Sequence, residues 1–150
     1  MSASANQLRP RDRDEHGSAA IEAAIGIPAF GLFVAMIILG GRVAVAKQSV
    51  EAAAYEAARA ASIERTQGEA INSGKTAATS SLYDQDVNCT TTNVTVNAAA
   101  FDAPLGTTGH VTATVTCNVD LSDLTLPGVP GHRVITATAS SPVDAYRERR

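Results

Sequence analysis

The sequence predicts an α+β protein in which a long N-terminal helix continues into a second helical segment and packs on a small antiparallel β-meander. Three observations carry this prediction. Residues 23–41 are nineteen consecutive positions without a charged side chain. An Ala-rich segment of helical periodicity follows directly, and Val/Thr-rich runs with alternating polarity fill the second half. The first feature suits a helix in lipid, and the other two suit a helix packed on a sheet.

The N-terminal part of the chain changes character at Ser18. Residues 1–17 are polar and charged, without periodicity, and read as a leader. Residues 18–42 are apolar up to Arg42, and about 18 apolar residues suffice to cross a hydrocarbon layer of roughly 30 Å. A buried helix of a soluble protein is the alternative, but so small a protein could not surround a helix that is apolar on every side. We therefore predict a transmembrane helix over residues 18–42.

Helical character continues beyond Arg42 in a segment rich in strong helix formers. One helix is predicted from Ser18 to Thr66, about 70 Å long at 1.5 Å per residue. Gln67-Gly68 is expected to break it, and a weaker helix is expected from Glu69 to Tyr83. The small apolar positions that define one face of the first helix recur at three- and four-residue steps: Val43, Ala46, Val50, Ala53, Ala57, Ala60 and Ala61.

Three runs in the second half predict the strands of a meander: 86–97, 110–120 and 133–140. In the second run, alternate residues from Val111 to Val119 share one apolar face. One face of the sheet is expected to lie against a helix. The predicted organisation is a cytoplasmic leader (1–17), a transmembrane helix (18–42), an extracytoplasmic helical region (43–83) and a β-rich domain with a short C-terminal tail (84–150).

The two cysteines, Cys89 and Cys117, both lie downstream of the apolar segment, each in a β run. A hairpin between the first two runs would bring them within disulfide reach if a bulge in the first strand corrects the side-chain parity. Closing a loop of 27 intervening residues would stabilise the fold by roughly 3–4 kcal/mol. Two unlinked thiols remain the alternative, and the predicted position outside the cytoplasm favours the disulfide.

The most specific feature is a carboxylate, Glu22, near the start of the apolar helix. An intramembrane carboxylate is costly and is a functional candidate by default, although a side chain near the helix end can also snorkel to the interface. Residues 16–62, HGSAAIEAAIGIPAFGLFVAMIILGGRVAVAKQSVEAAAYEAARAAS, resemble the TadE-like family of tight-adherence (Flp) pilus proteins. The resemblance lies in Gly-Ser, an apolar pair before Glu, a Pro-containing apolar helix and an Ala-rich helix. One departure is Ala23, where pseudopilins of this system usually have an aromatic residue.

The resemblance implies a membrane-anchored pseudopilin or pilus assembly component. It implies cleavage between Gly17 and Ser18 by a prepilin peptidase, which exposes a new α-amino group. In an array of pilin-like subunits that cation would pair with Glu22 of a neighbour. Pro28 is tolerated in the span and would bend or loosen it. The small residues that offer close helix contact are Ser18, Ala19, Ala20, Gly26, Gly31, Gly40 and Gly41.

The predicted location is the cell membrane, crossed once, with the N-terminus cytoplasmic and the C-terminal domain extracytoplasmic. Three arginines precede the span (Arg9, Arg11 and Arg13), and Arg42 and Lys47 follow it, so the positive-inside bias points weakly the same way. The alternative interpretation is that the apolar segment is a secretory signal. Signal peptidase would cut after Ala46, in the A-x-A sequence Ala44-Val45-Ala46, and release a small soluble disulfide-bonded domain. The apolar region is longer than a usual signal, and Glu22 would be unusual in one.

Composition and motifs argue against catalysis and nucleic-acid binding. A formal net charge of −3 shows no basic surface for nucleic acid. The three histidines (His16, His110 and His132) lack metal-ligand spacing, and no phosphate-binding or nucleophile motif is present. We therefore expect no enzyme activity, no metal, no cofactor and no small-molecule substrate. The expected partners are the membrane, other pilin-like or pilus assembly subunits, and the prepilin peptidase.

Overall fold

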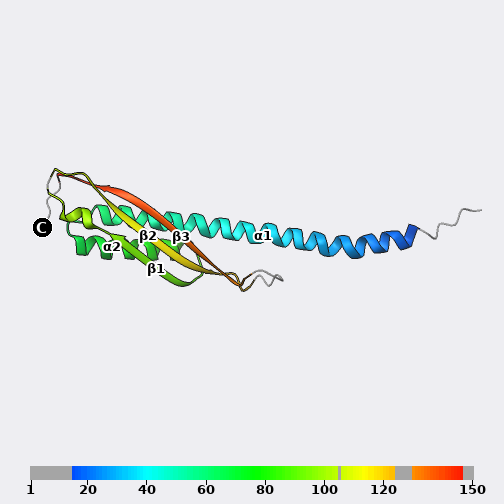
Figure 1. The fold of residues 1–150 in the computed structure, drawn as a ribbon. Helices are drawn as coiled ribbons and strands as arrows, with labels where there is room; N and C mark the ends of the chain where they lie inside the picture. The colour runs from blue at the N-terminus through cyan, green and yellow to red at the C-terminus, as the bar shows by residue number, and fades with distance from the viewer. Residues whose placement is uncertain (1–14, 105, 124–129, 147–150) are drawn as a thin grey trace, which may run out of the picture. The chain divides into compact units, whose positions relative to one another are not determined.

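The computed structural model describes residues 15–104, 106–123 and 130–146, with side chains from Ala20 onward. Its fold is α+β, with two helices and a three-stranded antiparallel sheet, as predicted (Figure 1). The chain divides into two compact units, residues 1–38 and residues 39–150. The elements in chain order are α1 (Glu15–Ser62), α2 (Gln67–Asp84), β1 (Cys89–Asn97), the 3-10 turn η1 (Ala99–Asp102), β2 (Gly109–Asp120) and β3 (His132–Val143).

The long helix is continuous but ends earlier than predicted. It stops at Ser62, and the break before α2 precedes Gln67-Gly68, so the prediction that these two residues break the helix is wrong. The reason is a cap at Thr66, whose hydroxyl oxygen accepts a hydrogen bond from the Glu69 backbone N–H at 3.2 Å and donates one to the Glu69 carboxylate at 3.0 Å. Thr66 and Glu69 have the spacing of a capping box, which starts a new helix. Gln67 and Gly68 therefore lie in the first turn of α2.

The sheet is a meander in the order β1-β2-β3, antiparallel throughout. Alternation along β2 follows the prediction, because Val111, Ala113, Val115 and Cys117 are fully buried and the threonines that alternate with them are only partly buried. The predicted bulge is present as a register shift between Cys89 and Thr91. Beyond it, Val94 and Val96 pair with inward-facing residues of β2, so the bulge restores the parity of the apolar side chains.

The core of the second unit lies between the sheet and two helical segments on one face of it, the second half of α1 and α2 (Figure 1). The sheet covers an alanine-rich face of α1, much as the three- and four-residue spacing predicted. Ser141 of β3 also donates a hydrogen bond to Ser62 at the end of α1. The buried alanines and valine of α1 are Ala46, Val50, Ala53, Ala54, Ala57, Ala58 and Ala61.

Gly74 allows α2 to approach its neighbours closely. A Cβ atom at this position would lie 3.0 Å from Cγ2 of Val96, 3.1 Å from the carbonyl oxygen of Ala57 and 3.3 Å from Cβ of Ala61. These atoms come from β1 and α1, so one glycine sets the distance among three elements. The sequence predicted only a weaker helix from Glu69 to Tyr83, whereas the structure gives Gly74 within it a packing role.

Gly74→Val is therefore expected to lower the free energy of unfolding by about 1–3 kcal/mol, because a branched side chain overpacks a site with a rigid backbone oxygen at its edge. Gly68→Val is the matched control, since a Cβ at Gly68 in the same helix meets nothing within 4 Å. Urea unfolding followed by circular dichroism measures both variants. Equal stability of the two would contradict the packing role of Gly74.

Candidate functional site

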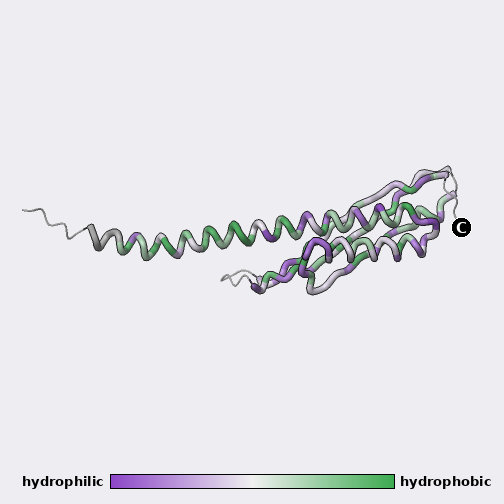
Figure 2. The backbone as a smooth tube through the Cα atoms, turned by 180° about the vertical axis from the view of Figure 1, so that it is seen from behind, coloured by the Kyte–Doolittle hydropathy of each residue, from purple (hydrophilic) through white to green (hydrophobic). Residues whose placement is uncertain are grey.

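The first unit presents apolar side chains of α1 that no other described part of the chain covers. Ile21, Phe30 and Met36 are 64%, 67% and 69% exposed. No part of the most apolar window of this helix is buried inside the molecule, and the tube in Figure 2 is dominated by hydrophobic colouring over this half of α1. The helix is long and apolar enough to cross a membrane, and it lies near the N-terminus.

The residues singled out in this segment all lie on α1. The Gly17–Ser18 peptide bond is inside the first turns of the helix, which begins at Glu15. Glu22 follows four residues after Ser18, so the two share one helix face. The Glu22 and Pro28 side chains are exposed, with Pro28 inside the continuous helix. The proline leaves one backbone carbonyl of the preceding turn without its helical donor.

Four glycines along α1 expose bare backbone. A Cβ atom built at Gly26, Gly31, Gly40 or Gly41 would meet nothing within 4 Å. This contrasts with the crowded environment of Gly74, where the absence of a side chain serves packing within the chain. Small residues on the surface of a helix let a second helix approach closely in lipid. The open positions on α1 therefore suit contacts between molecules.

The two cysteines form a disulfide, as predicted. Cys89 is paired in register with Val119 and Cys117 with Thr92, so the bond crosses the β1–β2 ladder diagonally near the register shift. The Cα atoms are 5.4 Å apart, within the usual range for a disulfide. Cys117 is fully buried and Cys89 partly so. The bond ties the start of β1 to the central strand of the sheet.

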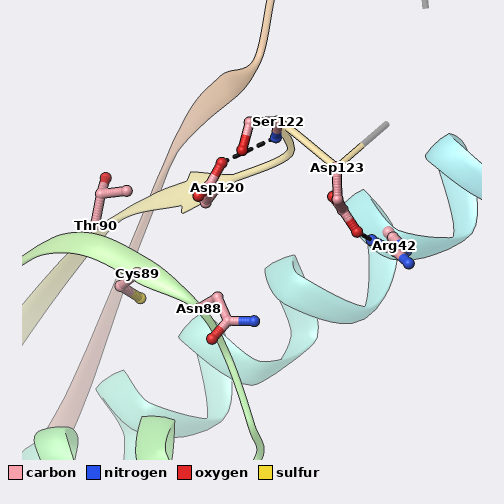
Figure 3. Close-up of a pocket in the computed structure, with 7 residues that line it drawn as sticks. All are labelled: Arg42, Asn88, Cys89, Thr90, Asp120, Ser122 and Asp123. Atoms are coloured by element: carbon pink, nitrogen blue, oxygen red, sulfur yellow. Dashed lines mark hydrogen bonds and ion pairs between the residues drawn. The ribbon is translucent and has the colours of Figure 1, made fainter. Parts of the chain in front are cut away.

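An open polar pocket of about 430 Å³ lies beside this disulfide (Figure 3). The guanidinium of Arg42 forms an ion pair with the carboxylate of Asp123, both about half-exposed, so the pair contributes little to stability. Hydrogen bonds from the hydroxyl and the backbone N–H of Ser122 lower the pKa of Asp120, and the charge of His132 lowers it further. The pocket is lined by Arg42, Asn88, Cys89, Thr90, Asp120, Ser122 and Asp123.

These polar groups do not form a recognisable catalytic arrangement. Within the described residues, no three His, Cys, Asp or Glu side chains come close enough to hold a metal ion. His110 and His132 are exposed at the starts of β2 and β3, as the sequence suggested. The His16 side chain lies outside the described residues. The side chains around the pocket are hydrogen-bonded, ion-paired, disulfide-bonded or exposed to solvent.

Sequence reasoning missed the contact between Arg42 and Asp123. In the sequence, Arg42 marked the end of the apolar run and supplied one of the positive charges after it, and Asp123 was not singled out. The two are 81 positions apart, and no local pattern connects them. The only available signal was that both are charged residues next to apolar segments. Their contact joins α1 to the connection that follows β2.

Comparison with known proteins agrees with the resemblance carried by the first helix. Residues 17–59 match the family described as TadE-like protein. No curated protein and no solved structure matches the chain. The matched stretch begins at the predicted processing site and includes Glu22, Pro28 and most of the alanine-rich face. The predicted family resemblance is therefore confirmed over α1, and residues 17–59 form a TadE-like segment.

Proposed function

We propose that this chain is a membrane-anchored pseudopilin or pilus assembly component of a tight-adherence or type IV-like system. In this proposal α1 is the membrane anchor and the site of contact with other pilin-like subunits. The single observation that carries it is an exposed apolar helix in a TadE-like segment. A run of apolar side chains this long is stable in water only when something covers it, and lipid is the cover with the right chemistry.

The length of the exposed run supports the anchor. Residues 20–38 of α1 have almost no buried side chain, and nineteen residues span about 28 Å at 1.5 Å per residue. This length is close to the roughly 30 Å of a bilayer hydrocarbon core. From Leu39 onward the helix belongs to the second unit and is progressively covered by it. The division between the units therefore falls where the lipid-exposed run ends.

Glu22 supports a role in assembly. A carboxylate exposed on a lipid-facing helix costs up to about 2.5–3.5 kcal/mol at the bilayer centre and less near the edge. Peptidase cleavage between Gly17 and Ser18 would expose an α-amino group on Ser18. Pairing of that cation with Glu22 of a neighbouring subunit would offset the cost of both charges in lipid. The bare glycines of α1 would let the paired helices approach.

The proposal assigns the protein a structural role, without a catalytic step or a cofactor. Its N-terminus is cytoplasmic and its disulfide-bonded unit lies outside the cytoplasm, where the bond persists. In the domain organisation we propose, residues 1–17 are the leader, 18–42 the span, 43–83 the outer helical region and 84–150 the β-rich part. The partners are membrane lipid, other subunits of the pilus machinery and the prepilin peptidase.

The alternative is release of a secreted domain by signal peptidase after Ala46. Two observations weigh against it. Ala46 is only 6% exposed and lies in the core, and the helix runs without interruption through Ala44-Val45-Ala46. Cutting there requires local unfolding of a helix that packs on the sheet. Cleavage would also detach Leu39 and Val43, which pack against the core.

Mass spectrometry of the native protein, after membrane and soluble fractions are separated, tests the proposal. We expect the protein in the membrane fraction with Ser18 as its first residue. Gly17→Leu should block cleavage and leave the full-length chain in the membrane. Recovery of a soluble fragment that begins at Lys47 would overturn the proposal in favour of the secreted domain.

A further inference from the structure

A small crevice lies in the second unit at the point where α1 enters it. Its volume is about 80 Å³, well below the 300–1,000 Å³ of a pocket for a drug-sized ligand. The apolar wall is formed by Leu39 and Val43, which are partly buried, and by Leu121, which is 4% exposed. His132 and Arg133 are exposed at its mouth. We call this cavity the basal crevice. Its lining residues are Leu39, Val43, Leu121, Pro130, His132 and Arg133.

The basal crevice lies close to the end of the lipid-exposed run along the same helix. Ile38 is 48% exposed, and the next residue, Leu39, already belongs to the crevice. Val43 follows little more than one helical turn later, at about 5.4 Å per turn. The headgroup layer on each side of the hydrocarbon core is also only about 5–8 Å thick. When the hydrocarbon core ends near Ile38, the last turn of the proposed span, residues 39–42, lies in the headgroup layer, and the crevice lies at the same depth.

The charges at the mouth suit a phosphate. Among the described residues, Arg42 forms an ion pair with Asp123, but Arg133 forms none. Arginine presents a fork of donors that matches phosphate oxygens, and its stem can lie along apolar surface while its head reaches the interface. The charge of His132 already acts on Asp120. Within the part of the chain that the structure describes, Arg133 is therefore a cation at this end that has no ion-pair partner and can bind a ligand.

We propose that the basal crevice binds a phospholipid of the membrane that α1 enters. The glycerol portion contacts Leu39, Val43 and Leu121, and the phosphate contacts Arg133, with His132 beside it. This inference rests on the proposed membrane anchor and adds a second attachment. The sheet-containing unit then docks on the bilayer surface in a fixed orientation, and is not merely tethered to it by the helix.

Tryptophan fluorescence tests the docking, because the chain contains no tryptophan. The full chain is placed in lipid nanodiscs that carry a nitroxide on the headgroup. Val134→Trp puts a probe next to Arg133, at a side chain that is 61% exposed. Tyr146→Trp, at a side chain 88% exposed beyond the other end of β3, is the matched control. β3 has twelve residues, so about 36 Å of strand separates the two ends.

We expect strong quenching of the Val134→Trp probe and none above background for Tyr146→Trp. In nanodiscs that contain anionic lipid, adding Arg133→Gln should lower the equilibrium constant for docking about fivefold, since one arginine near such headgroups contributes about that factor, whereas Arg59→Gln should change nothing. Absent or equal quenching at the two probes, in a chain that co-floats with lipid, overturns the docking and leaves the anchor intact. A chain that fails to float with lipid overturns both the docking and the proposed function.

Discussion

Loss of the disulfide is expected to lower the free energy of unfolding of the second unit by about 3–4 kcal/mol. The bond links residues 28 positions apart, and its loss frees the unfolded chain to explore many more conformations. Small domains have only about 5–15 kcal/mol of stability in total. The effect should be large here because the core is built mainly from alanine and valine, which bury little area each.

The measurement compares the oxidised wild-type chain with the same chain reduced by dithiothreitol, and with Cys89→Ala combined with Cys117→Ala. Urea unfolding in detergent, followed by circular dichroism, gives the midpoints. Val115→Ala is the control for cavity formation, because Val115 is as fully buried in β2 as Cys117 but forms no cross-link. If reduction leaves the midpoint unchanged, the bond does not stabilise the fold.

Glu22→Ala is expected to leave membrane insertion intact and to abolish assembly with other subunits. Insertion becomes easier, because a carboxylate is removed from the apolar segment. In the pairing that we propose, assembly suffers because the α-amino group of a neighbour loses its partner, and an unpaired charge in lipid costs about 3–5 kcal/mol. That cost corresponds to a fall in association of a hundredfold or more.

Co-purification of the tagged protein with pilus subunits, alongside membrane fractionation, measures the two effects separately. Glu56→Ala is the matched control, since Glu56 is an exposed carboxylate on the same helix in the second unit. Wild-type yields of the assembled complex with Glu22→Ala would rule out the pairing role. Loss of the variant from the membrane would instead mean that Glu22 serves insertion.

The local patterns were sufficient to predict most of the elements. Alternation along β2 and the conflicting parity of Cys89 and Val94 allowed both the meander and its bulge to be inferred, because side-chain direction in a strand has a strict period of two. The length of the uncharged run, residues 23–41, predicted the apolar half of α1. These features depend on residues that are close together in the sequence.

One local boundary was misplaced, and features that depend on long-range contacts were missed. The end of α1 was predicted at Thr66 because Gln67-Gly68 was expected to break the helix, and the capping spacing of Thr66 and Glu69 was overlooked. The Arg42–Asp123 ion pair has no sequence signature, since surface charges pair with whatever the fold brings near. The role of Gly74 appears only when two helices and a strand meet.

The hydrogen bond between Ser62 and Ser141 joins residues 79 positions apart, and this has a consequence for the order of events during synthesis. β3 is made long after the helix that it meets, so Ser62 at the end of α1 gains this partner only after α2, β1 and β2 have been made. Folding therefore depends on contacts between residues that are far apart in the sequence, and dependence on such contacts slows folding. A ribosome stalled before β3 would leave the central strand with a bare edge, open to pairing with a neighbouring nascent chain.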